Sequence, residues 1–135
     1  MLEVRRERIP MKTAVVSATA PTPAGPYSHG IIANGFLYTA GFGPQDVSTG
    51  TIPEGVAAQT HQVLKNIESV LAEAGLTTDD VVKSTVHLAN LDRDFAEYNA
   101  AYLEHFSAPF PVRTTVGSTL AGILVEIDVV AALRS

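Results

Sequence analysis

Hydrophobic residues recur with the period of an α-helix in two stretches, residues 56–74 and 95–106. Pro53 and Glu54 suit the first turn of the earlier stretch, and Gly75 suits the left-handed conformation that follows a last turn. The later stretch places one apolar and aromatic stripe on a single side, formed by Phe95, Tyr98, Asn99, Tyr102, Leu103 and Phe106. We therefore predict two amphipathic helices.

The remaining apolar positions alternate with polar ones, as they do in β-strands. Asn34 and Gly35 separate two apolar runs within residues 31–40 and suit a type I′ turn, so they predict a hairpin. Further strands are predicted at residues 81–88, 112–117 and 124–132, which are rich in β-branched side chains. Two sets of residues are expected to share a face: Val82, Ser84, Val86 and Leu88, and Val125, Ile127, Val129 and Ala131.

The order of these elements predicts an α+β sandwich in which two helices cover one face of a mostly antiparallel sheet. Apolar residues on both faces of several strands predict that a second subunit covers the other face, in a closed homo-oligomer. Residues 11–135 are expected to form one domain. Residues 1–10, which carry Arg5, Arg6 and Arg8, are expected to be a flexible N-terminal extension.

Composition and charge narrow the classes of function. A hydrophobic content of 46% excludes a disordered chain, and a net charge of −5 disfavours nucleic acid as the main ligand. The absence of cysteine excludes disulfides and thiolate sites, and with no long apolar run we expect a soluble, cytoplasmic protein. Histidine spacing predicts no metal site, and no glycine-rich nucleotide motif or G-x-S-x-G motif occurs, so no cofactor is expected.

Two charges inside predicted strands are the candidates for chemistry. Arg113 lies in F-P-V-R-T-T-V and Glu126 in L-V-E-I-D-V-V. Each alone is typical of a solvated strand residue. Together they describe a pocket for a small carboxylate, because an arginine fork binds a carboxylate through two hydrogen bonds and a nearby glutamate transfers protons to or from water.

Six short motifs follow one another through the chain. They are A-x-x-P-A-G-P-Y-S-H-G from Ala20, A-G-F-G-P-Q-D-x-x-T-G from Ala40, Q-T-H-Q-V-L-K-N-I from Gln59, N-A-A-Y from Asn99, F-P-V-R from Phe110 and V-E-I-D from Val125. In this order they resemble the reactive-intermediate deaminase family, also called RidA/YjgF. The resemblance implies a chorismate-mutase-like α+β fold, a homotrimer with clefts between subunits, and no cofactor.

The same resemblance implies an enzyme that hydrolyses enamine and imine acids, such as 2-aminoacrylate and 2-iminobutyrate, to 2-keto acids and ammonia. Arg113 matches the residue that binds the substrate carboxylate, and Glu126 matches the acid associated with the hydrolytic water. The positions that match further substrate contacts are Tyr27, Gly41, Asn99 and Thr115.

Several positions depart from the family pattern, among them Leu120-Ala121-Gly122, which stands where the family commonly has Leu-Pro before its V-E-I-E segment. Ala40 and Phe42 stand where the family often has serine and glutamine, and Thr115 stands where cysteine is frequent. These changes alter the expected pocket rim, so other functions stay open. One alternative is deamination of a larger, aminomuconate-like enamine acid. Another is a non-catalytic trimer that binds small carboxylates or partner proteins, whereas action on RNA fits poorly with the acidic charge.

Overall fold

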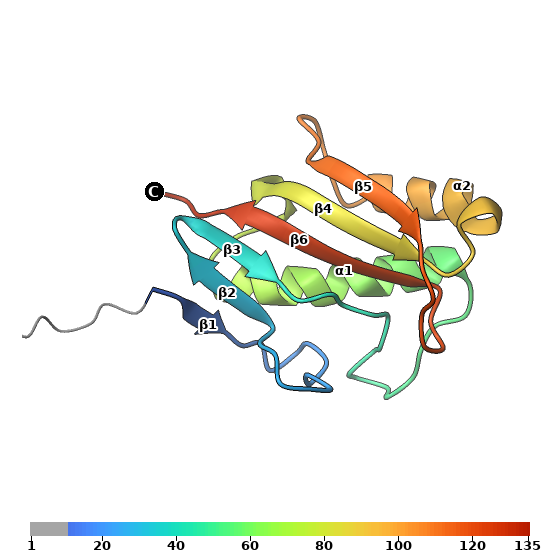
Figure 1. Cartoon of the computed structure of the whole chain (residues 1–135), viewed down its shortest axis with the longest axis horizontal. Helices are drawn as coiled ribbons and strands as arrows, with labels where there is room; N and C mark the ends of the chain where they lie inside the picture. The colour runs from blue at the N-terminus through green and yellow to red at the C-terminus, as the bar shows by residue number, and fades with distance from the viewer. Residues whose placement is uncertain (1–10) are drawn as a thin grey trace, which may run out of the picture.

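The structure, a computed structural model, describes residues 11–135 as a six-stranded sheet with two helices (Figure 1). The predicted extension at residues 1–10 lies outside the described residues. In chain order the elements are β1 (Thr13–Val15), β2 (Gly30–Ala33), β3 (Phe36–Thr39), α1 (Val56–Glu73), the 3₁₀ turn η1 (Thr78–Asp80), β4 (Val81–Leu88), α2 (Leu91–Leu103), β5 (Val112–Gly117) and β6 (Val125–Ala132).

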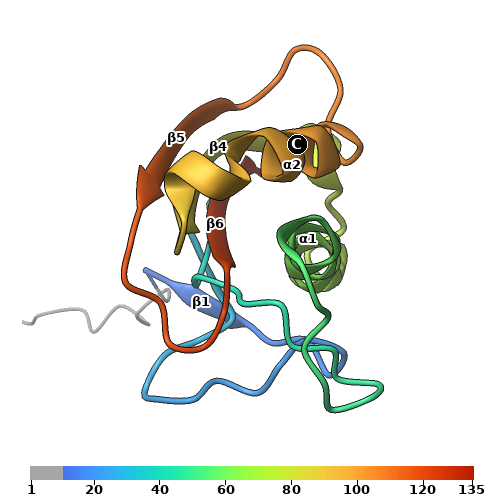
Figure 2. The same cartoon turned by 90° about the vertical axis from the view of Figure 1, so that its right-hand side faces the viewer.

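The sheet has the strand order β1-β2-β3-β6-β4-β5, and every neighbouring pair is antiparallel except β4 and β5. The parallel pair is connected by α2, which crosses back over the sheet between the two strands. Figure 2 shows α1 and α2 on the same side of the curved sheet. The predicted α+β class, with both helices on one face of a mostly antiparallel sheet, is confirmed.

The turn and cap residues behave as their backbone preferences require. Asn34 and Gly35 have φ angles of 51° and 85° between β2 and β3, which confirms the hairpin. After α1, Gly75 has a φ of 72°, and the N–H of Leu76 donates to the carbonyl of Leu71 at 2.9 Å. This left-handed cap ends the helix as predicted.

The start of α1 differs from the prediction. The helix begins at Val56, so Pro53 and Glu54 precede it and do not form its first turn. The reason is Gly55, whose φ of 88° lies outside the helical region. The helix therefore cannot extend back through Gly55 and begins at Val56.

The hydrophobic core fills the space between the helices and one face of the sheet. The predicted stripe of α1 is buried, and on β6 the predicted alternation is confirmed because every second residue is buried and those between are half-buried. The fully buried side chains include Leu37, Val63, Leu64, Val70, Leu71, Val86, Leu88, Tyr98, Val125 and Ile127. None of the helices between residues 11 and 135 is long and apolar enough to cross a membrane.

Two predicted buried faces need correction. On β4 the register shifts between Val81 and Lys83, so Val81 is buried and Val82 is 42% exposed. On α2 the predicted stripe is buried at its centre, but Phe95 and Leu103 are exposed. These two residues lie on the side of α2 that is near β5. Because β5 is the edge strand, no further strand covers them.

The register shift makes a direct prediction about stability. Val86→Ala should lower the free energy of unfolding by about 2 kcal/mol, because it removes two methyl groups from a fully buried site. Val82→Ala, on the same strand, should change it by less than about 0.5 kcal/mol. Urea unfolding at a fixed protein concentration measures both values, and equal losses would contradict the shift.

Candidate functional site

Arg113 lies on the edge strand β5, on the side of the sheet that α2 covers. It is the register partner of buried Ser84 on β4, and the parallel crossover brings α2 over both residues. The guanidinium carbon lies 4.7 Å from the ring centre of Tyr102 and 5.3 Å from that of Tyr98. Among the described residues, no carboxylate lies within ion-pairing distance of Arg113.

A cavity of about 380 Å³ opens beside this guanidinium. Its wall holds one cation and one carboxamide, and the rest is apolar or aromatic, an arrangement that fits a small ligand with one anionic group. The lining residues are Asn99, Tyr102, Leu103, Phe110, Pro111 and Arg113. The structure therefore brings together two of the predicted site residues, Arg113 and Asn99. Thr115 follows two positions along β5, where its hydroxyl bonds the Tyr98 hydroxyl at 3.0 Å.

Burial raises the pKa of both Tyr98 and Tyr102 above the ordinary value, although the nearby guanidinium and hydrogen bonds to Thr115 and Ser84 act in the opposite direction. Both rings therefore stay uncharged at neutral pH. An uncharged phenol does not neutralise Arg113, so the positive charge of this cavity is available to an anionic group.

Glu126 lies on the opposite side of the sheet. Its neighbours on β6, Val125 and Ile127, are fully buried under the helices, so the Glu126 side chain extends from the uncovered face. A methyl group added at Gly41 would lie 3.0 Å from the Glu126 carboxyl carbon. Glycine at this position leaves the space that the carboxyl group occupies. The loop that contains Gly41 is held beside β6, because Phe42 and Ile127 form two backbone hydrogen bonds with each other, at 2.8 and 3.1 Å.

A second cavity, of about 310 Å³, includes this carboxyl group. It is lined by Pro21, Thr22, Ala24, Tyr27, Gly41, Phe42, Gly43, Gln45, Ile123 and Glu126. Tyr27 is half-exposed, and its hydroxyl accepts a hydrogen bond from the N–H of Ala24 at 3.0 Å. The structure thus brings three more predicted residues together: Tyr27, Gly41 and Glu126.

Polar side chains surround Glu126 on the uncovered face. His87 is its register partner on β4, and the His87 ring bonds the Ser118 hydroxyl at 2.6 Å. Two residues along β6, burial raises the pKa of Asp128, while the charges of His87 and Lys83 act to lower it. This part of the uncovered face therefore already excludes some water.

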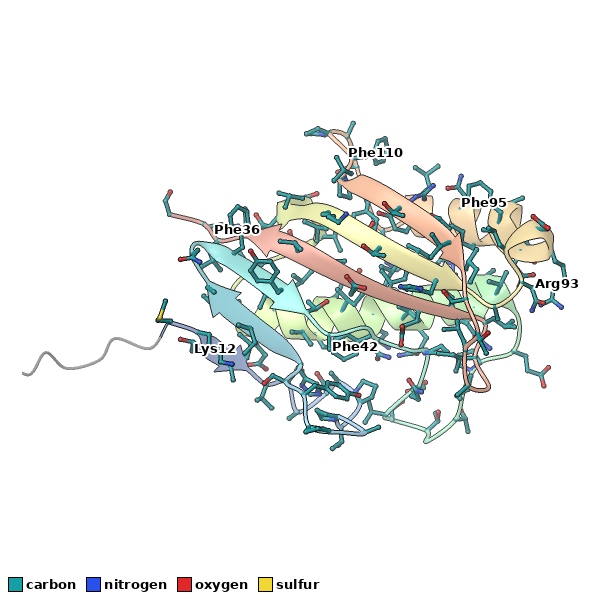
Figure 3. All side chains as sticks on the ribbon, viewed as in Figure 1. Lys12, Phe36, Phe42, Arg93, Phe95 and Phe110 are labelled. Atoms are coloured by element: carbon teal, nitrogen blue, oxygen red, sulfur yellow. The ribbon has the colours of Figure 1, made fainter. Side chains whose placement is uncertain are left out.

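The two cavities share no lining residue. Arg113 belongs to the covered face and Glu126 to the uncovered face, so one chain does not bring the predicted pair into a single pocket. Figure 3 shows Phe95 and Phe110 near β5 and Phe42 beyond β6. Exposed apolar side chains also extend over the uncovered face and the edge strand: Phe36, Tyr38, Val112 and Val116.

Some residues that shape these cavities were not expected from the sequence. Tyr98 and Tyr102 were predicted only as core residues, yet they contact Arg113. Asn66 is buried, and its amide donates to the carbonyls of Gly43 and Gln45, at 3.0 Å each, so it fixes the loop beside Glu126. Its presence in the motif Q-T-H-Q-V-L-K-N-I was a signal for a role of this kind.

Phe42 lines the Glu126 cavity, as the sequence predicted, but it does so as an almost fully buried residue. The residue is 4% exposed, and its ring packs on His29 with ring centres 5.6 Å apart. His61 on α1 and His105, in the turn after α2, bond each other at 2.8 Å. Within residues 11–135, no three metal-ligating side chains gather in a suitable arrangement.

Comparison with known proteins places this arrangement in a family. The family model described as endoribonuclease L-PSP matches residues 17–133. A RutC family protein from Pyrococcus horikoshii is 42% identical over 124 residues, which cover 90% of this chain and 98% of that protein. A 2-iminobutanoate/2-iminopropanoate deaminase from Salmonella typhimurium is 35% identical over 129 residues, which cover 92% of this chain and all of that protein.

The solved structures agree with the sequence relatives. The crystal structure of E. coli TdcF with bound serine matches with a TM-score of 0.83 at 31% identity, covering 91% of this chain and 99% of that one. The chain therefore belongs to the endoribonuclease L-PSP family, which is the RidA/YjgF family that its motifs resemble.

The buried tyrosines predict how stability depends on alkaline pH. Burial raises the pKa of Tyr98 and Tyr102 in the folded chain, so the unfolded chain loses these protons first as the pH passes about 10. The free energy of unfolding should fall from that pH upward. Urea unfolding between pH 8 and 11 measures this fall. The double variant Tyr98→Phe, Tyr102→Phe should show a shallower one, and an equally steep fall would contradict the assignment.

Proposed function

We propose that the protein hydrolyses small 2-imino and enamine monocarboxylic acids, such as 2-aminoacrylate and 2-iminobutyrate, to 2-keto acids and ammonia. The observation that carries this proposal is Arg113, a cation without an acidic partner among the described residues, at the wall of a small and otherwise mostly apolar cavity. The name of the deaminase relative and the serine bound to the TdcF structure support a small carboxylate as ligand.

The number of cations favours a monocarboxylate over a larger dicarboxylic enamine acid. Among residues 11–135, Arg113 is the only lysine or arginine that lines either the Arg113 cavity or the Glu126 cavity. One guanidinium binds one carboxylate through two parallel hydrogen bonds. A second carboxylate would lose part of its hydration in such a cavity without gaining a second cation as partner. The net charge of −5 likewise disfavours RNA as substrate.

Once the substrate is oriented, the reaction needs only a group that binds its carboxylate and a group that accepts a proton from water. Arg113 binds the carboxylate, and the Glu126 carboxylate accepts a proton from a water molecule that attacks the imine carbon. The carbon gains a bond to oxygen and then loses its bond to nitrogen. An enamine acid first becomes the imine, as one proton moves from its nitrogen to C3. In the imine, both protons of the water end on the nitrogen, which leaves as ammonia, and a 2-keto acid remains.

The site needs Arg113 from one chain and Glu126 from another, because the two side chains extend from opposite faces of one sheet. A homotrimer with a site in each of its clefts meets this need. The exposed apolar residues of the uncovered face and of β5 supply surface for such contacts, since patches of this kind are typical of subunit interfaces.

Replacement of Arg113 tests the carboxylate contact. A pyridoxal-phosphate dehydratase generates 2-aminoacrylate or 2-iminobutyrate in the assay, with semicarbazide as the competing trap, and keto-acid formation is followed. Arg113→Ala should lower kcat/KM by roughly 100-fold, because the carboxylate loses the cation that binds it. Arg134→Ala, which removes an arginine paired with Asp80 at 2.9 Å, is the matched control and should retain activity. Unchanged hydrolysis by Arg113→Ala would exclude the proposed role.

Mixing two inactive variants tests whether the site spans two chains. Arg113→Ala and Glu126→Gln are refolded together in equal amounts. If each site takes its arginine and its glutamate from different subunits, about a quarter of the sites regain both groups, and activity returns to about that fraction of wild type. If both groups came from one chain, the mixture would stay inactive. Each variant refolded alone is the control.

A further inference from the structure

The guanidinium of Arg113 is stabilised by the faces of aromatic rings. Its carbon lies over the rings of Tyr102, Tyr98 and Phe95, at 4.7, 5.3 and 6.0 Å from their centres. Tyr98 is fully buried and Tyr102 is 5% exposed, so the cation lies against surfaces that water does not reach. A charge in such surroundings needs compensation, and the negative face of an aromatic ring supplies it.

Both tyrosine rings are tied to the two strands that position Arg113. The Tyr102 hydroxyl bonds the Ser84 hydroxyl at 2.6 Å, and Ser84 is the register partner of Arg113 on β4. The Tyr98 hydroxyl bonds the Thr115 hydroxyl at 3.0 Å, two residues beyond Arg113 on β5. Each ring is therefore fixed at its base by α2 and at its tip by the sheet, which leaves it little freedom to move away from the guanidinium.

A ring face and a carboxylate hold a guanidinium in different ways. A carboxylate inside the chain would accept two of the five N–H donors, which all lie in the guanidinium plane. A ring attracts the charge through its face and accepts no in-plane hydrogen bond. Among residues 11–135, no side chain accepts a hydrogen bond from the Arg113 guanidinium. The cation is stabilised while its donors stay available for a ligand.

We propose that Tyr98 and Tyr102 are positioning residues that hold the Arg113 guanidinium through their ring faces and so set its affinity for a carboxylate ligand. The identity of that ligand rests on the proposed function, whereas the contact between rings and guanidinium does not. The rings act on ligand binding, so their removal raises KM more than it lowers kcat.

The first experiment compares two substitutions at one position by calorimetric titration with 2-ketobutyrate, a product that undergoes no further reaction. Tyr102→Leu removes the ring and should weaken binding roughly 10-fold, whereas Tyr102→Phe keeps the ring and should bind within about twofold of wild type. Phe106→Leu is the control for core damage. Its ring stacks on Tyr102 at 4.4 Å but lies away from Arg113, so this variant should lose stability and keep its affinity.

The second experiment observes the contact itself by NMR. The side-chain protons of Arg113 should show an upfield ring-current shift in wild type and in Tyr102→Phe, and a smaller one in Tyr102→Leu. Absence of the shift in wild type would overturn the proposal, as would equal weakening of 2-ketobutyrate binding by the Leu and Phe substitutions. If wild type neither binds 2-ketobutyrate nor hydrolyses imines, the proposed function fails, and the ring-current shift alone decides whether the rings hold Arg113.

Discussion

Burial of only one face of the sheet is the constraint on which the other features of this structure depend. Two helices cover that face, and side chains along each strand alternate between it and the uncovered face. Ile127 therefore belongs to the core, whereas Glu126 next to it does not. Arg113 extends to the covered side beneath α2. Arg113 and Glu126 are thus separated by the sheet itself, so the function that we propose requires a second copy of the chain.

The two halves of the proposed site are built by opposite means. Around Arg113 the protein adds bulk, because tyrosines from α2 fill the space beside the guanidinium and bond to Ser84 and Thr115. Around Glu126 it removes bulk, because the missing side chain of Gly41 leaves room for the carboxyl group. A site with one fixed cation and one carboxylate suits a substrate that is already electrophilic, since such a substrate needs orientation and a water more than a nucleophile.

Much of the fold could be predicted because local patterns determine it. The helical period of α1, the Asn34 and Gly35 turn and the alternation along β6 each involve residues close in the chain, and the structure confirms all three. Two of the errors arose where a local irregularity of the backbone changed the geometry. Gly55 delayed the start of α1, and a register shift turned Val82 outward. Such irregularities cost little free energy locally, so a periodic pattern does not reveal them.

By itself, the sequence determined the class of fold, the family, and Arg113 and Glu126 as the charges to consider. The short motifs indicate the family and the two charges, and the alternation along the strands indicates the fold class. Both patterns can be read from residues that are close together in the chain. Only the tertiary structure decided that these charges lie in different cavities, that Phe42 is a core residue on His29, and that two predicted core tyrosines contact Arg113. The contacts of Tyr98 and Tyr102 with Arg113 depend on the crossover that lays α2 over β4 and β5, whereas the other two facts depend on the loop of Phe42 lying beside β6. Residues brought together in these ways are far apart in the sequence and leave no periodic pattern along the chain.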